Sequence, residues 1–86
     1  QNYPNPFNPQ TWIDFSLPKA QTVSLRIYDE RGRLVKTLVD GLTDEGDHHI
    51  RWDGKDNGGR GAASGVYYYL LKSDSGTLRH KMTLLR

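Results

Sequence analysis

Short runs in which apolar and polar side chains alternate recur along this chain, and they constrain its fold more than any other feature. Successive side chains of a β-strand point to opposite faces of a sheet, so this alternation predicts strands with one buried face. Glycine, proline and other turn-forming residues separate the runs roughly every ten residues, a spacing typical of antiparallel β-sandwiches. No segment repeats apolar residues at intervals of three and four, so no helix is predicted.

Six segments carry the pattern. We predict strands over residues 11–17, 22–28, 33–39, 47–53, 66–72 and 78–85. Gly32 and Gly76 close two predicted hairpins, because glycine adopts the positive φ of a bulged turn at little cost. The run 33–39 is apolar on both faces, which predicts a central position in a sheet or a neighbour against one face. Trp52 is assigned to the core.

The opening residues form a separate element. Three prolines in the first nine residues exclude a helix and favour extended backbone. Tyr3 and Phe7 are large apolar side chains within this run, and docking on a domain would explain them. We therefore expect residues 1–10 to form a stiff extended strap and residues 11–86 to form the sandwich.

Length and charge bound the function. A chain of 86 residues makes one small domain, which we expect to be a monomer, and it contains no cysteine. The formal net charge is +2, with acids and bases interspersed, so we expect no nucleic-acid partner, which would need a concentrated basic face. No run approaches the eighteen apolar residues of a membrane span, so we expect no membrane insertion.

Catalytic and zinc sites find no support in the sequence. Ser64 lacks the glycine two residues before it that a nucleophile elbow requires. His48 and His49 are adjacent on one predicted strand, so their rings point to opposite faces and cannot share a metal. We expect His48 on the inner face, His49 in solvent, no enzymatic activity and no cofactor.

The polar segment 54–65 is the best candidate for a metal site. Asp53, Asp56 and Asn57 offer the hard oxygen ligands that calcium prefers, and the neighbouring glycines permit tight curvature. Lys55, however, stands where an EF-hand has a second acidic ligand. Hydrogen bonds from these side chains to their own turn explain the same residues, and we favour that structural role over calcium.

Two surfaces are candidates for binding. Trp12, Tyr67 and Tyr69 form a possible glycan platform, although aromatic side chains on sheets more often pair across strands and cover the core. The predicted last strand offers partners its edge or the terminal carboxylate. The residues assigned to partner recognition there are Lys81, Met82, Leu84, Leu85 and Arg86. Charges on this strand also discourage aggregation through its edge.

Ordered blocks over most of the chain resemble a known domain family. The blocks are Asn2-Tyr3-Pro4-Asn5-Pro6-Phe7-Asn8-Pro9, Leu17-Pro18, Ile27-Tyr28-Asp29, Trp52-Asp53-Gly54, Ala63-Ser64-Gly65-Val66-Tyr67 and Lys81-Met82. They are similar to the type A C-terminal sorting domain of the type IX (Por) secretion system. They are equally similar to the immunoglobulin-like domain of the flagellar hook-capping protein.

This resemblance implies an immunoglobulin-like antiparallel β-sandwich of six to seven strands. It implies a non-catalytic module that directs a larger parent protein through the periplasm of a Gram-negative bacterium to the cell surface. The expected partners are the outer-membrane secretion machinery and the upstream domain of the parent protein. The alternative function is a carbohydrate-binding or structural accessory module of a secreted multidomain enzyme.

Overall fold

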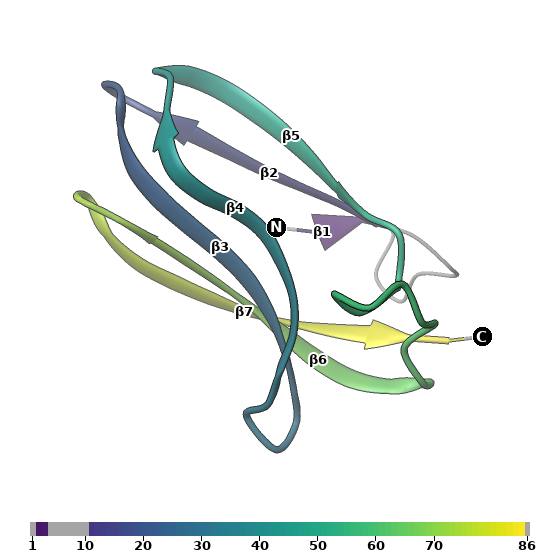
Figure 1. Cartoon of the computed structure of the whole chain (residues 1–86). Helices are drawn as coiled ribbons and strands as arrows, with labels where there is room; N and C mark the ends of the chain where they lie inside the picture. Colours follow the sequence, from purple (N-terminus) through teal and green to yellow (C-terminus); the bar gives the residue numbers. More distant parts are fainter. Residues whose placement is uncertain (1, 4–10, 86) are drawn as a thin grey trace.

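The computed structural model describes residues 2–3 and 11–85, which form seven β-strands (Figure 1). The strands are β1 (Asn2–Tyr3), β2 (Thr11–Leu17), β3 (Gln21–Asp29), β4 (Leu34–Thr43), β5 (Gly46–Trp52), β6 (Gly65–Ser73) and β7 (Gly76–Leu84). The described residues contain no helix, and therefore none that is long and apolar enough to cross a membrane.

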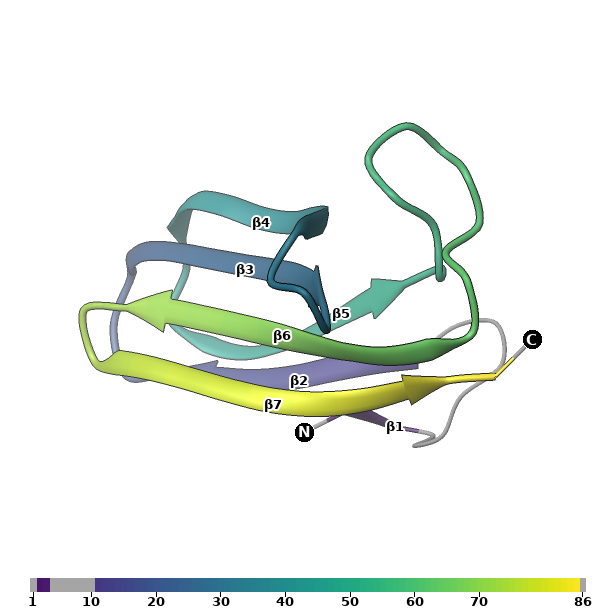
Figure 2. The ribbon, with the colours of Figure 1, turned by 90° about the horizontal axis from the view of Figure 1, so that it is seen from below.

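The strands form two antiparallel sheets packed face to face. One sheet has the order β1-β2-β5 and the other has the order β4-β3-β6-β7. Figure 2 shows the second sheet in front of the first, with β4 and β7 at its two edges. This arrangement confirms the predicted immunoglobulin-like β-sandwich. The short connection from β4 to β5 joins the two sheets, so these strands lie on the same side of the sandwich.

The core lies between the sheets and is centred on β3. Val23, Leu25 and Ile27 alternate along this strand and are completely buried, as predicted. The other buried apolar side chains come from both sheets: Ile13, Leu17, Trp52, Tyr67, Tyr69, Leu71, Met82 and Leu84. Burial of an apolar side chain of this size contributes about 1.5–3 kcal/mol, so even a thin layer holds the two sheets together.

The strand that contains residues 33–39 differs from its prediction. It continues to Thr43, and β4 is an edge strand, so a central position was wrong. Two register shifts between β3 and β4 explain the apolar side chains on both sides of this run. Each β-bulge inserts an extra residue and reverses the alternation, and Val35, Leu38 and Val39 all pack against the core.

The two glycine hairpins are present, with one difference. At the first, Gly32 has φ +82° and its N–H donates to the carbonyl of Asp29 at 3.0 Å, as a bulged turn requires. At the second, Ser73 pairs directly with Gly76, so Asp74 and Ser75 form a two-residue turn instead of the predicted bulged one.

Only a small part of the predicted strap is described. Asn2 and Tyr3 form β1, which pairs antiparallel with β2 through the partners Asn2–Ile13 and Tyr3–Trp12. The expectations for the side chains of Tyr3 and Phe7 and for the strap over residues 4–10 lie outside the described residues.

Replacing Leu25 with alanine should lower the free energy of unfolding by about 2–5 kcal/mol, because it removes a fully buried side chain and leaves a cavity. The same replacement at Leu42, which is 79% exposed on the neighbouring strand, should change it by less than about 0.5 kcal/mol. Urea denaturation measures both. Equal effects would contradict the assigned core.

Candidate functional site

The last strand, β7, is the edge of the four-stranded sheet, which leaves one side of its backbone without a neighbouring strand in the described sheet. Lys81 is exposed on this strand and Leu85, just beyond it, is 50% exposed. Met82 and Leu84 are completely buried, so their assignment to partner contact was wrong for the folded domain. They alternate with Lys81 and Thr83, and the pleat directs them into the core. Arg86 lies outside the described residues.

The segment between β5 and β6 is a small closed hairpin. Ala62 N donates to Gly54 O at 2.8 Å, Asp56 N donates to Arg60 O at 2.8 Å, and Lys55 forms an isolated bridge with Gly61. Two core aromatic side chains fix its ends. Trp52 Nε1 donates to the carbonyl of Lys55 at 2.9 Å, and the hydroxyl of Tyr67 donates to the carbonyl of Ala63 at 2.6 Å.

The three calcium candidates accept hydrogen bonds from backbone N–H groups. Asp53 Oδ1 accepts from Lys55 N at 3.0 Å, and Asp56 Oδ1 accepts from the N–H groups of Gly58 and Arg60 at 2.9 Å. Asn57 reaches further: its Oδ1 accepts from Thr37 N at 3.1 Å. These are the turn-stabilising contacts that such side chains make.

Asn57 therefore attaches the hairpin to β4. Its backbone N–H donates to Val35 O at 2.9 Å, in addition to the side-chain contact with Thr37. Within residues 2–3 and 11–85, no group of three or more His, Asp or Glu side chains is arranged to hold a metal ion.

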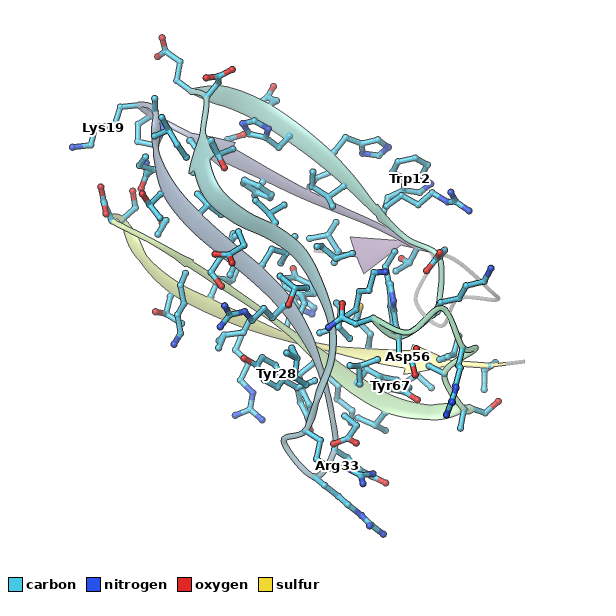
Figure 3. The ribbon with its side chains drawn as sticks, in the orientation of Figure 1. Trp12, Lys19, Tyr28, Arg33, Asp56 and Tyr67 are labelled. Carbon is cyan, nitrogen blue, oxygen red and sulfur yellow. The ribbon has the colours of Figure 1, made fainter. Side chains whose placement is uncertain are left out.

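The predicted glycan platform is not assembled. Tyr67 is 7% exposed and Tyr69 is fully buried, because both face inward from β6, so their assignment to an exposed platform was wrong. Tyr67 packs edge-on against Trp52, with ring centroids 5.4 Å apart. Burial also raises the pKa of Tyr69 above its ordinary value of 10.0. Trp12 lies on the opposite sheet, on its outer face (Figure 3).

The histidines are placed largely as predicted. The ring of His48 stacks on Phe15 at 5.1 Å, and its Nε2 lies 2.7 Å from the carbonyl oxygen of Asp44. His49 is exposed, stacks parallel to Trp12 at 4.2 Å and contacts the carboxylate of Asp14. The adjacent side chains lie on opposite faces of β5, as the strand geometry requires.

Asp29 organises the hairpin between β3 and β4. Its Oδ1 accepts from the N–H groups of Arg31 and Arg33 at 2.9 Å, and its Oδ2 pairs with Arg33 Nε at 2.9 Å. The hydrogen bond from the Arg33 backbone is the largest influence that holds the pKa of Asp29 below its ordinary value of 3.8, while desolvation opposes it.

An aromatic and basic surface on the outer face of the four-stranded sheet was missed as a site. Tyr28 and Tyr68 are direct partners on β3 and β6, and the guanidinium of Arg79 on β7 lies 4.4 Å from the centre of the Tyr68 ring. The sequence did indicate that these three side chains point outward, because they alternate with the core residues along their strands. The sequence does not show which strands are neighbours, so these three side chains could not be placed on one surface from the sequence alone.

The family model for the FlgD Ig-like domain matches residues 9–77. Three solved structures have the same fold at low identity. FlgD from P. aeruginosa is 24% identical over 86% of this chain and 58% of that one, with a TM-score of 0.65. Dimeric latent PorU from Porphyromonas gingivalis is 24% identical over 99% of this chain and 9% of that one, with a TM-score of 0.74.

The third is PorZ, described as an essential surface component of the type IX secretion system of P. gingivalis. It is 22% identical over the whole of this chain and 11% of that one, with a TM-score of 0.69. The chain thus spans from 9% to 58% of the length of these proteins. No curated protein matches the sequence.

Replacing Asn57 with alanine should expose the Thr37 amide to exchange and destabilise the domain by about 0.5–1.5 kcal/mol, the usual contribution of one hydrogen bond. Asn57→Asp, which keeps the acceptor oxygen, should retain most of the protection. Amide hydrogen exchange measured residue by residue distinguishes the two. Unchanged protection of Thr37 in the alanine variant would show that the hairpin is not attached through this side chain.

Stability should decline as the pH falls below about 4, and part of that decline should disappear in Asp29→Asn. The folded pKa of Asp29 is lowered, so its contribution is present above the ordinary pKa and is lost as the pH falls through the folded value. Melting temperatures between pH 5 and pH 2 measure the effect. Glu30→Gln, the adjacent exposed control, should follow the wild type; identical curves for all three proteins would exclude Asp29 as a contributor.

Proposed function

The chain belongs to the FlgD Ig-like domain family, and we propose that it is a non-catalytic recognition module of a larger exported protein. In this role the folded sandwich directs its parent across the outer membrane to the cell surface. The likeness to domains within PorU and PorZ supports the secretion context, because PorZ is described as a surface component of a type IX system.

The edge position of β7 is the structural observation that carries this proposal. A strand at the edge of a sheet is a position at which an extended segment of another protein can add a further strand. Lys81 and Leu85 are exposed beside this edge, and Met82 and Leu84 fasten it to the core. Because these two buried side chains hold β7 in place, this strand loses little conformational entropy when a partner binds.

The buried residues of β7 determine how the function has to be tested. Deleting residues 81–86 would remove Met82 and Leu84 from the core, and misfolding alone would then block export. Substitution of Lys81 by glutamate together with Leu85 by aspartate changes the exposed contacts and leaves the core intact. Lys19→Glu, in the exposed turn between β2 and β3, is the matched control.

A reporter enzyme that carries a signal peptide and this domain at its C-terminus should reach the surface of a bacterium with a type IX system. The Lys81→Glu, Leu85→Asp variant should accumulate in the periplasm by at least about tenfold over the wild type, the effect expected from losing roughly 1.4 kcal/mol of binding. Cell fractionation with the reporter assay measures this ratio, and Lys19→Glu should behave as the wild type.

Two results would contradict the proposal. One is retention of the wild-type fusion in the periplasm of a host whose own type IX substrates reach the surface. The other is equal surface delivery by a fusion that lacks the domain altogether. Either would favour a structural accessory role within the parent protein.

A further inference from the structure

The outer face of the four-stranded sheet carries side chains in two adjacent rows. In antiparallel sheets, residues directly opposite each other project from the same face. The strand registers therefore place Tyr28, Tyr68 and Lys81 in one row across β3, β6 and β7. The next row on the same face consists of Arg26, Leu70 and Arg79. Tyr28 lies on this face beside the β3–β4 hairpin (Figure 3).

This face has more positive charge than it can neutralise itself. Its cations are Arg26, Lys72, Arg79 and Lys81. Among the described residues, none of them forms an ion pair within 4 Å; the pairs found are Asp29–Arg33 and Asp14–His49. The register places one acid, Asp40 opposite Ser24, on the same face. Asp29, which is paired with Arg33, and Glu30 lie at the hairpin end of the face.

Arg26 and Arg79 are held in different ways. The guanidinium of Arg79 rests above the Tyr68 ring, a cation–π contact that fixes its position and leaves its N–H groups able to bind a carboxylate. Arg26 Nε is buried and has no hydrogen-bond acceptor among the described residues. Because this atom is closed to solvent, a partner would have to bind Arg26 through its terminal N–H groups.

The side chains of this surface argue for a protein rather than a small molecule. Tyr28, Tyr68, Leu70 and Arg79 line a shallow groove of about 280 Å³ together with the hairpin at 29–32. This volume is close to the lower end of the range for small-molecule sites, about 300–1,000 Å³, so the volume alone does not select the class of ligand. Tyrosine and arginine around an apolar centre are instead the side chains that dominate the binding energy of protein interfaces.

We propose that the outer face of β3, β6 and β7 docks an acidic segment of a partner protein. The partner's carboxylates pair with Arg26, Arg79 and Lys81, and an apolar side chain packs between Tyr28 and Leu70. We choose an acidic segment because of charge complementarity: a neutral or basic segment would leave the cations of this face unpaired. Asp29 and Glu30 line the hairpin end of the groove, so the partner's acidic residues lie toward β7.

The size of the face predicts a transient complex. The three strands of this face are nine residues long and about 4.8 Å apart, so they present roughly 400–450 Å². A stable interface buries about 800 Å² on each partner, so this face belongs with the weak, short-lived class. The inference goes beyond the proposed function, because that function uses the edge of β7 and this surface is a face of the sheet.

A display library of random twelve-residue peptides, panned against the 86-residue domain at low salt, tests the proposal. Enriched peptides should be acidic and contain an aromatic or aliphatic residue. A synthetic enriched peptide should bind at least tenfold more weakly to the Arg26→Glu, Arg79→Glu variant and to Tyr68→Ala. Its affinity should also fall as the salt concentration rises. Lys19→Glu with Arg60→Glu, an equal charge reversal at exposed turns, should bind the peptide more tightly than the Arg26→Glu, Arg79→Glu variant.

Circular dichroism confirms that each variant is folded, and Lys72→Glu provides an independent variant on the same face. Three results would overturn the proposal. The first is enrichment of neutral or basic peptides, and the second is an affinity that Arg26→Glu with Arg79→Glu leaves unchanged. The third is equal or tighter binding of polygalacturonate or a single-stranded oligonucleotide to the same residues, which would identify a general polyanion site.

Discussion

The strand register across β3 and β6 is the constraint on which the other features of this domain depend. It turns Leu25, Ile27 and Tyr69 toward the three-stranded sheet, and all three are fully buried. The same register turns Tyr28 and Tyr68 outward to the face with Arg79. A slip of one residue would exchange the two sets, because the side-chain period of a strand is two. Core and surface are therefore specified together.

The small core also organises the surface around it. Trp52 and Tyr67 are buried between the sheets, yet their polar atoms reach the carbonyls of Lys55 and Ala63 and hold both ends of the hairpin between β5 and β6. The two bulges in β4 direct three apolar side chains inward from an edge strand. The domain has no cysteine, so these hydrogen bonds fasten the hairpin to the core without a disulfide.

Much of the fold was predictable from alternation and turn residues. The strand at 11–17 was predicted with its observed bounds, and the inward residues of β3 and the burial of Trp52 were also correct. The edge position of β4 was missed because its two bulges interrupt the alternation of apolar and polar residues and make both faces of the strand look buried. The extension of this strand to Thr43 was missed for a different reason, because Gly41 within the strand resembles a loop signal.

The candidate sites were less predictable than the fold, since they depend on which strands are neighbours. Tyr67, Tyr68 and Tyr69 are consecutive, and only the sheet pairing decides that the middle one is partly exposed on the outer face and the other two are buried. Charges that are interspersed along the sequence also gather on one face, because every second residue of three neighbouring strands points outward. Composition alone does not show such a patch.

The register that separates the core from the docking face is tested most directly by nuclear Overhauser effects in the NMR spectrum of the domain. Contacts between the backbones of Tyr28 and Tyr68 and of Tyr68 and Lys81, together with slow exchange at the core of β3, are the expected result. Contacts of Tyr28 with Tyr67 or Tyr69 as its directly opposed partner would show a shifted register and would contradict both the core and the docking face.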